Sequence, residues 1–391
     1  MSAGMHASAA DSGAEVARSG DGHASDRFDR LLHEIDALID RDEAADRAVG
    51  GGWKTFDDIT AAANAHAWDA YSVDLSVDAE SYRALERDQQ EALLRVFGTI
   101  YRAESVVDDW MDRIVAAVPR EDEGRTTGEG LGYDAMRTAL KGQEHDEKMH
   151  RGSLVRVATE VLGIPPEDVD RVARKYDNFV AETLFARFDG QMRYLLRAGR
   201  PMQDVYAAIF IYGILSEDVV ANSDVVIRRA KGRGIYDGFD LPGMKEGQTN
   251  VRRDEGRHVR IAVLCTRRYL AEYEGAAARL SALATEYMDL ADRLLRDAKR
   301  SHGLIDLHLR ESYGPDVDSL YYYVMNMKRL AVRLDELGLR ECVLDVRRRV
   351  EEAVVRYTDD ERRPIVETPN VIVRKLGPRV LRLAEVGRSQ S

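Results

Sequence analysis

Two histidines of the chain lie in the same short pattern, in which a glutamate precedes a histidine by three residues. Glu147 and His150 form the first pair, and Glu255 and His258 form the second. Residues three apart share one face of an α-helix, so each pair can direct a carboxylate and an imidazole at the same metal ion. Either pair alone is weak evidence, because this pattern often arises by chance on a solvated helix face.

A further glutamate in an apolar, helix-like stretch precedes each pair. Glu104 comes before the first pair and Glu217 before the second, which gives the order Glu, Glu-x-x-His, Glu, Glu-x-x-His. Carboxylate-bridged metal pairs in helical bundles use this set of ligands. Four buried carboxylates would repel one another strongly without a cation between them. The order and spacing therefore predict a site for two metal ions about 3.5–4 Å apart.

The identity of the fourth carboxylate and of the metals is less constrained by the residues alone. Glu182 also lies in an apolar stretch, so it could replace or join Glu217, or be a polar residue bonded within the bundle or at its rim. Oxygen donors with one imidazole per metal suit iron and manganese, and Mn/Fe and Fe/Fe pairs accept the same donors. Positions left open on such metals could bind dioxygen.

The elements that must position these residues are helices, because apolar residues recur at spacings of three and four along most of the chain. No alternating strand pattern of useful length is visible, and the short connections suit antiparallel neighbours in an all-α bundle. A polar loop is expected at 119–132 and a Gly-rich loop at 232–247. The expected helices cover residues 81–117, 133–162, 166–197, 202–230, the stretch after 247 to 271, 278–300, 316–337 and 340–357.

Composition limits the class of protein. With 391 residues, the chain is long enough to bury a sizeable core, and no apolar run reaches the 18 residues that a membrane span requires. The net charge of −12 disfavours nucleic acid as a partner. We expect a disordered tail at 1–26, which lacks the apolar segment of a signal peptide, a helical domain at 27–360 and a C-terminal tail at 361–391.

The two cysteines, Cys265 and Cys342, have neither metal-binding nor redox-type spacing. We expect them to be reduced thiols in the core of a cytoplasmic protein. A homodimer is the expected assembly.

Beyond these patterns, the chain resembles the ribonucleotide reductase small-subunit superfamily over roughly residues 60–340. The resemblance rests on the segment from Trp68 to Ser76 with Ala84-Leu85 and Glu104, on Arg253 to His258, and on Tyr323 to Leu339. It implies a ferritin-like helical bundle, here with extra C-terminal helices. The metal ligands that it implies are Glu104, Glu147, His150, Glu217, Glu255 and His258.

Within that superfamily, the chain is most similar to the ligand-binding oxidases, through residues 241–247 and through Tyr212, five residues before Glu217. Members of that group hold a manganese–iron or di-iron pair beside a long-chain fatty acid. They form an ether link between a tyrosine and the valine three residues after the first ligand, which implies Val107 and Tyr212 here and favours Glu217 over Glu182. Both linked residues could instead be ordinary core residues.

The main alternative is a true reductase small subunit. The radical tyrosine of that family lies four residues after the first ligand histidine, where this chain has Leu154, and residues 358–391 contain no tyrosine to relay a radical. Trp68 and Asp254 match relay residues, although packing and a hydrogen bond to a ligand histidine would explain them equally. We therefore expect an oxidase that acts without a large subunit, on a long-chain aliphatic ligand. A second alternative is a non-catalytic, metal-binding ferritin-like protein.

Overall fold

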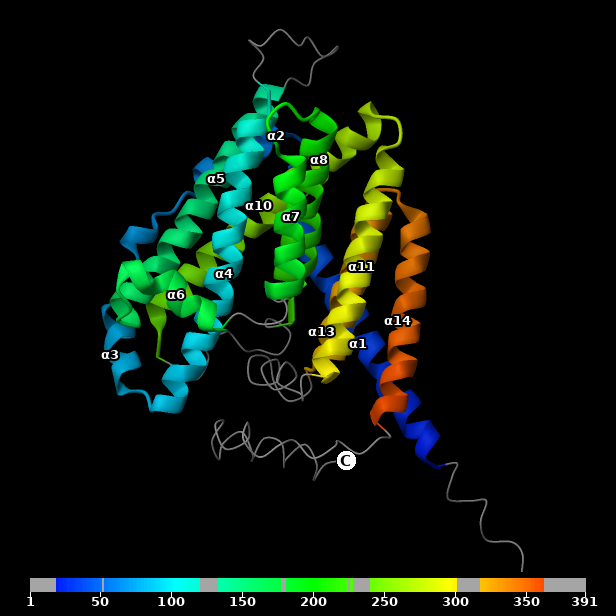
Figure 1. Cartoon of the computed structure of the whole chain (residues 1–391), viewed down its shortest axis with the longest axis horizontal. Helices are drawn as coiled ribbons and strands as arrows, with labels where there is room; N and C mark the ends of the chain where they lie inside the picture. Colours follow the sequence, from blue (N-terminus) through cyan, green and yellow to red (C-terminus); the bar gives the residue numbers. More distant parts are fainter. Residues whose placement is uncertain are drawn as a thin grey trace, which may run out of the picture.

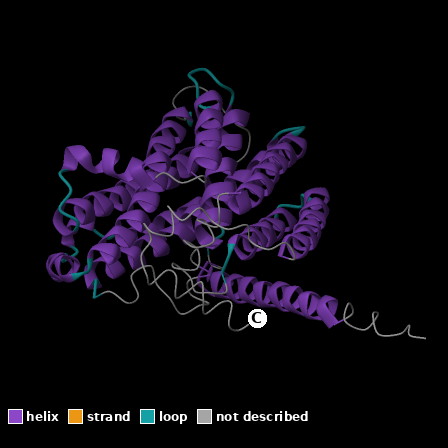
Figure 2. Ribbon diagram, turned by 60° about the horizontal axis from the view of Figure 1, so that its bottom comes forward, coloured by secondary structure: helices purple, strands orange, loops and turns teal. Residues whose placement is uncertain are grey.

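The computed structural model describes residues 19–50, 53–119, 133–176, 181–223, 226–227, 240–300 and 317–361. All regular secondary structure in these ranges is helical (Figure 2). The longer helices are α1 (Ser19–Gly50), α2 (Phe56–Ala65), α3 (Ser76–Ala84), α4 (Arg87–Ala117), α5 (Tyr133–Arg156), α7 (Ala186–Leu195), α8 (Met202–Ile209), α10 (Pro242–Glu272), α11 (Ala276–Arg300), α13 (Ser319–Glu336) and α14 (Arg340–Glu361).

Three segments are π-helical: η3 (Val157–Val161), η6 (Ala181–Phe185) and η7 (Phe210–Ala221). Such segments are rare and occur often at functional sites, because the wider turn displaces side chains from their α-helical positions. The short elements η1 (Ala70–Ser72), η4 (Pro166–Asp168), α6 (Val169–Ala173) and η5 (Arg174–Tyr176) complete the connections.

The helices form two adjoining groups. In one, α4 packs on α5, and α10 packs on both α5 and η7. In the other, α13 contacts α1, α11 and α14, and this group lies along one side of the molecule (Figure 1). Contacts of α13 and α11 with η7 join the two groups, so η7, the most apolar of the described helices, lies where they meet.

Several elements differ from the sequence prediction. The helix expected at 81–117 is two helices, because Glu86 caps the start of α4, where its backbone N–H donates to Gln89 Oε1 at 3.1 Å in a capping box. The helix expected at 166–197 is broken into short pieces. Two helices, α1 and α2, were not anticipated, and α1 begins at Ser19, within the tail expected at 1–26.

The Gly-rich loop expected to reach residue 247 ends earlier, because α10 begins at Pro242. The buried carboxylate of Asp78 accepts hydrogen bonds from the N–H groups of Gly243 and Met244 at 2.9 and 2.8 Å, which caps this helix. A Cβ at Gly243 would lie 2.2 Å from the carbonyl oxygen of Asp74, so only glycine allows this close approach of α3 and α10.

Residues 1–18, most of the polar loop at 119–132 and the tail from 362 lie outside the described residues. Among the helices that the structure describes, none is both long enough and apolar enough to cross a membrane. Cys265 and Cys342 are buried free thiols, as predicted.

Candidate metal centre

The six predicted ligands come from four helices that converge in the first group. Glu104 lies on α4, Glu147 and His150 on α5, Glu217 on η7, and Glu255 and His258 on α10. Both histidines are fully buried, and three of the four glutamates are at most 6% exposed. The side chains of Glu104, His150 and Glu255 form one potential metal-binding group, and those of Glu217, Glu255 and His258 form another.

In the first half of the site, the acidic side chains surround His150 Nδ1. This nitrogen lies 3.6 Å from Glu104, 3.4 Å from Glu147 and 3.9 Å from Glu255. In the second half, His258 Nδ1 lies 3.1 Å from Glu147 and 3.7 Å from Glu255. Glu147 and Glu255 therefore face both histidines, as two bridging carboxylates would, whereas Glu104 and Glu217 each belong to one half.

Unpaired polar atoms in the centre fit a pair of metal ions. Among the described residues, His150 Nδ1, His258 Nδ1 and Glu255 Oε2 are buried without a hydrogen-bond partner. Buried polar atoms in proteins are nearly always paired, so such atoms on adjacent side chains call for an explanation. Two imidazole nitrogens and four carboxylates supply one nitrogen and several hard oxygen donors per ion, which suits iron and manganese.

The electrostatics of the centre also favour cations. Burial, with added repulsion from Glu255 and Glu147, raises the pKa of Glu217 well above its usual value. Burial likewise raises the pKa of Glu104 to about 7. For Glu147 burial acts in the same direction, but the imidazoles of His258 and His150 outweigh it and lower the pKa of this carboxyl. Only added positive charge, as protons or metal ions, relieves this repulsion.

Both histidines are oriented from behind by an aspartate. His150 Nε2 lies 3.1 Å from Asp254 Oδ2, and His258 Nε2 lies 3.3 Å from Asp146 Oδ2. With Nε2 carrying the proton, each Nδ1 is free to bind a metal. Burial opposes ionisation of Asp254, but the hydrogen bond and charge of His150, the hydrogen bond from Trp68 and the charge of Arg257 together outweigh burial and lower the pKa to about 2.

The sequence analysis identified Asp254 but missed Asp146. Asp146 directly precedes Glu147 as Asp254 directly precedes Glu255, so both motifs read Asp-Glu-x-x-His, and that repetition is the signal that could have found it. Trp68 was predicted near the site, and its Nε1 donates to Asp254 Oδ2 at 2.7 Å.

Tyr212 and Val107 both belong to the apolar core, 1% and 4% exposed, and Val107 lies on α4 three residues after Glu104. The hydroxyl of Tyr212 donates to Glu147 Oε1 and accepts from Gln143 Nε2 at 2.8 Å. Tyr212 therefore contacts a proposed bridging ligand directly. It shares the π-helix η7 with Glu217.

Of the two rivals for the fourth carboxylate, Glu217 is buried and lies in the acidic cluster. Glu182 lies on η6, and its side chain is outside the described residues. The position of Glu217 on η7 is supported by its neighbour Asp218, which is fully buried. Asp218 forms ion pairs with Arg329 at 2.8 Å and Arg333 at 2.6 Å, both on α13.

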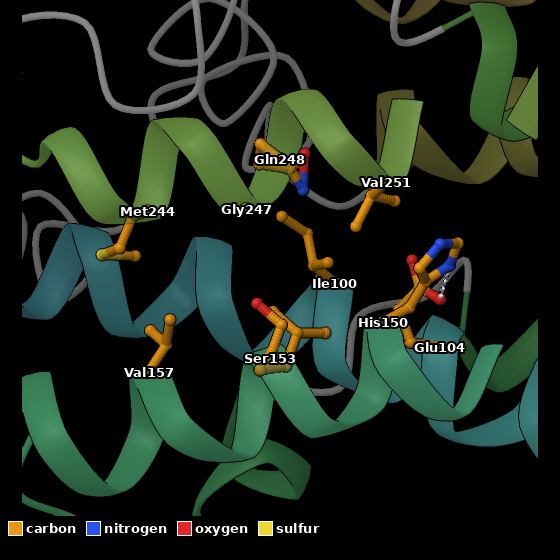
Figure 3. A pocket seen from close by; sticks show the side chains of 10 residues that line it. Ile100, Glu104, His150, Ser153, Val157, Met244, Gly247, Gln248 and Val251 are labelled. Atoms are coloured by element: carbon orange, nitrogen blue, oxygen red, sulfur yellow. Dashed lines mark ion pairs between the residues drawn. The ribbon is translucent and has the colours of Figure 1, made fainter. Parts of the chain in front are cut away.

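A pocket between α4, α5 and α10 ends at the centre, where Glu104 and His150 form its wall (Figure 3). Apolar side chains make up most of the remaining wall, with Met244 and Val157 at the end away from the centre (Figure 3). The other lining residues are Ile100, Ser153, Leu154, Gly247, Gln248 and Val251.

The fold is similar to that of R2-like ligand-binding oxidases. One such structure, with an aerobically reconstituted metal cofactor after photoconversion, matches with a TM-score of 0.53 and 18% identity, over 73% of this chain and 94% of that one. A mutant with an aerobically reconstituted Mn/Fe cofactor matches with a TM-score of 0.54 and 19% identity, over the same shares. Another mutant, with an anaerobically reconstituted Mn/Fe cofactor, matches with 0.53 and 18%, over 73% and 93%.

No protein-family model matches the chain. No curated protein matches it either. The structural likeness confirms the predicted all-α, ferritin-like bundle.

Proposed function

We propose that this chain is a dioxygen-dependent oxidase with a dinuclear metal centre. The observation that carries the proposal is the convergence of the six predicted ligands around two imidazole nitrogens that are buried without partners. Glu104 and His150 would bind one metal ion, Glu217 and His258 the other, and Glu147 and Glu255 would bridge them. Once bound, such a pair supplies the electrons that reduce dioxygen and generates the oxidising power of the site.

A Mn/Fe or Fe/Fe pair fits the donors, and the Mn/Fe cofactor of the similar structures supports the first of these. The protein's part is to hold the ligands in place and to keep water out. Asp254 and Asp146 fix the imidazole tautomers, and the surrounding apolar core excludes solvent. A cytoplasmic location and assembly as a homodimer stay predictions from the sequence.

The proposed substrate is a long-chain aliphatic molecule, such as a fatty acid, with its polar head toward the metals. The lining of the pocket beside the centre supports this class of ligand, because a polar end formed by Glu104 and His150 meets a wall that is mainly apolar. The helices around the pocket must separate to admit a long chain, since the pocket as it stands has room for little more than a water molecule. Binding sites for small molecules commonly combine an apolar lining with a few polar groups that fix orientation. The similar structures are themselves described as ligand-binding oxidases.

We further propose an ether link between Val107 and Tyr212. Its formation breaks the Val107 Cβ–H bond and the Tyr212 O–H bond and makes one C–O bond. The two electrons and two protons that are released pass to dioxygen. Support comes from the burial of both residues in one core and from the contact of the Tyr212 hydroxyl with Glu147.

Metal analysis combined with oxygen consumption tests the proposal. Protein loaded anaerobically with Mn(II) and Fe(II) should hold two metal ions per chain and should consume dioxygen in a single exposure. Glu217→Gln, which removes one terminal carboxylate, should lower the metal content toward one. Uptake of two metals without oxygen consumption would favour the non-catalytic ferritin-like alternative.

One observation favours a second candidate, a ribonucleotide reductase small subunit. Trp68 donates to Asp254, which contacts His150, and the Trp68 and His150 rings are stacked with centroids 6.4 Å apart. This chain of contacts could carry an electron between the protein surface and the metals. Leu154 argues against a reductase small subunit. It occupies the position of the radical tyrosine of that family, and in the structure it lines the pocket beside the centre. Metal-dependent ribonucleotide reduction with the large subunit from the same organism would overturn our choice.

A further inference from the structure

A buried guanidinium lies behind the metal centre, between the two aspartates that orient the histidines. Arg257 on α10 is 2% exposed, and its Nη2 lies 3.0 Å from Asp146 Oδ2 and 2.6 Å from Asp254 Oδ1. One nitrogen atom thus contacts a carboxylate on α5 and a carboxylate on α10. Arg257 makes no described contact with a proposed ligand, so the oxidase proposal does not use it.

The two aspartates act across the motifs rather than within them. Asp146 belongs to the motif of α5 but contacts His258 of α10, whereas Asp254 belongs to the motif of α10 but contacts His150 of α5. Each histidine is therefore oriented from the opposite helix. Arg257 closes this arrangement, because it is the group that both aspartates share.

We propose that Arg257 is a positioning residue that couples the two halves of the metal centre. Its charge and its hydrogen bonds hold both aspartates, and through them both imidazole rings, in one orientation. Arginine suits this role because its guanidinium stays charged and presents donors in a fixed plane. The inference rests on the proposed function, since the two histidines matter only if they bind metals.

The two halves do not depend equally on Arg257. Asp254 also accepts a hydrogen bond from Trp68 at 2.7 Å, so it keeps one anchor when the guanidinium is removed. Among the described residues, Asp146 has only Arg257 and His258 as side-chain partners. Loss of Arg257 should therefore weaken the half that contains His258 more than the half that contains His150.

Anaerobic titration with Mn(II), with free Mn(II) followed by electron paramagnetic resonance, tests this coupling. Wild type should bind two ions. Glu104→Gln should weaken the ion in the His150 half and Glu217→Gln the ion in the His258 half, so these variants show which measured affinity belongs to which half. Arg257→Gln should weaken the His258 half about 10–100-fold, the range typical for residues that support metal ligands, and the His150 half by less. Arg257→Lys, which keeps a cationic nitrogen, should recover part of the affinity. Arg253→Gln, at an exposed arginine of the same helix, should bind as wild type.

A double variant separates positioning from general destabilisation. If Arg257 acts on His258 through Asp146, then Arg257→Gln should weaken the His258 half no further once Asp146→Asn is present. The double variant also removes the buried Asp146 carboxylate, which Arg257→Gln alone would leave without a cation. If Arg257→Gln alone fails to fold, the double variant can therefore be compared with Asp146→Asn instead. Two outcomes would overturn the coupling and leave the metal centre intact. In one, Arg257→Gln weakens the His258 half equally in wild type and in Asp146→Asn. In the other, both affinities of Arg257→Gln lie within twofold of wild type. Wild type that binds fewer than two ions would overturn both.

Discussion

Replacement of Glu104 by glutamine should stabilise the metal-free protein and reduce the stability that bound metal adds. The Glu104 side chain is only 17% exposed and lies beside His150, with Glu147 and Glu255 close by. Burial is the main cause that raises its pKa from 4.5 to about 7. Without metal, ionisation of this carboxyl therefore costs free energy in the folded state that it does not cost in the unfolded chain.

The size and the pH range of this cost follow from the shift. A rise from 4.5 to about 7 corresponds to ~3 kcal/mol, at about 1.4 kcal/mol per pKa unit. Because the folded pKa is the higher one, the cost is absent below about pH 4.5, grows as the pH rises and is complete above about pH 7. Glu104→Gln should thus stabilise the metal-free protein by up to ~3 kcal/mol at pH 8, and hardly at pH 4.5.

Urea unfolding in the presence of a chelator, at pH 5 and pH 8, measures this effect by linear extrapolation. Glu91→Gln, at an exposed glutamate of the same helix, is the matched control and should change the free energy of unfolding by less than about 0.5 kcal/mol. With Mn(II) in place of chelator, Glu104→Gln should gain less stability from metal than wild type. A variant no more stable than wild type at pH 8 in chelator would refute the reasoning.

Three further predictions concern other parts of the site. In mass spectrometry of metal-loaded, oxygen-exposed protein, the peptides that contain Val107 and Tyr212 should be joined, with a mass two hydrogens below the sum of the two peptides. Tyr212→Phe should abolish this link and retain both metals. Asp218→Asn should lower the free energy of unfolding by about 3 kcal/mol, since two buried arginines lose a partner, whereas Asp109→Asn, at an exposed ion pair, should cost less than about 1 kcal/mol. Gly247→Leu should fill the pocket, because a Cβ there would already lie 3.1 Å from the Ser153 hydroxyl oxygen; lipid extracted from the purified variant should fall while metal content stays at two.

The sequence alone was enough to predict the helical bundle and the six candidate ligands. Both predictions depend on local geometry: helix periodicity places a glutamate and a histidine three residues apart on one face, whatever the helix packs against. The apolar surroundings of Glu104 and Glu217 likewise predict that these carboxylates face the interior, and in the structure Glu217 is buried and Glu104 partly buried. The choice of Glu217 over Glu182 used a family resemblance, because both glutamates have similar local surroundings.

Other features depend on how the helices pack, and only the tertiary structure could decide them. The aspartate of each motif orients the histidine of the other, across 104 and 112 residues of sequence, and Arg257 joins the two. Periodicity shows which face of a helix is buried but not which side chains from other helices meet it. The wide turns of η7 are equally invisible in the sequence, since an apolar run reads alike as α- or π-helix, although the difference determines where Tyr212 and Glu217 point.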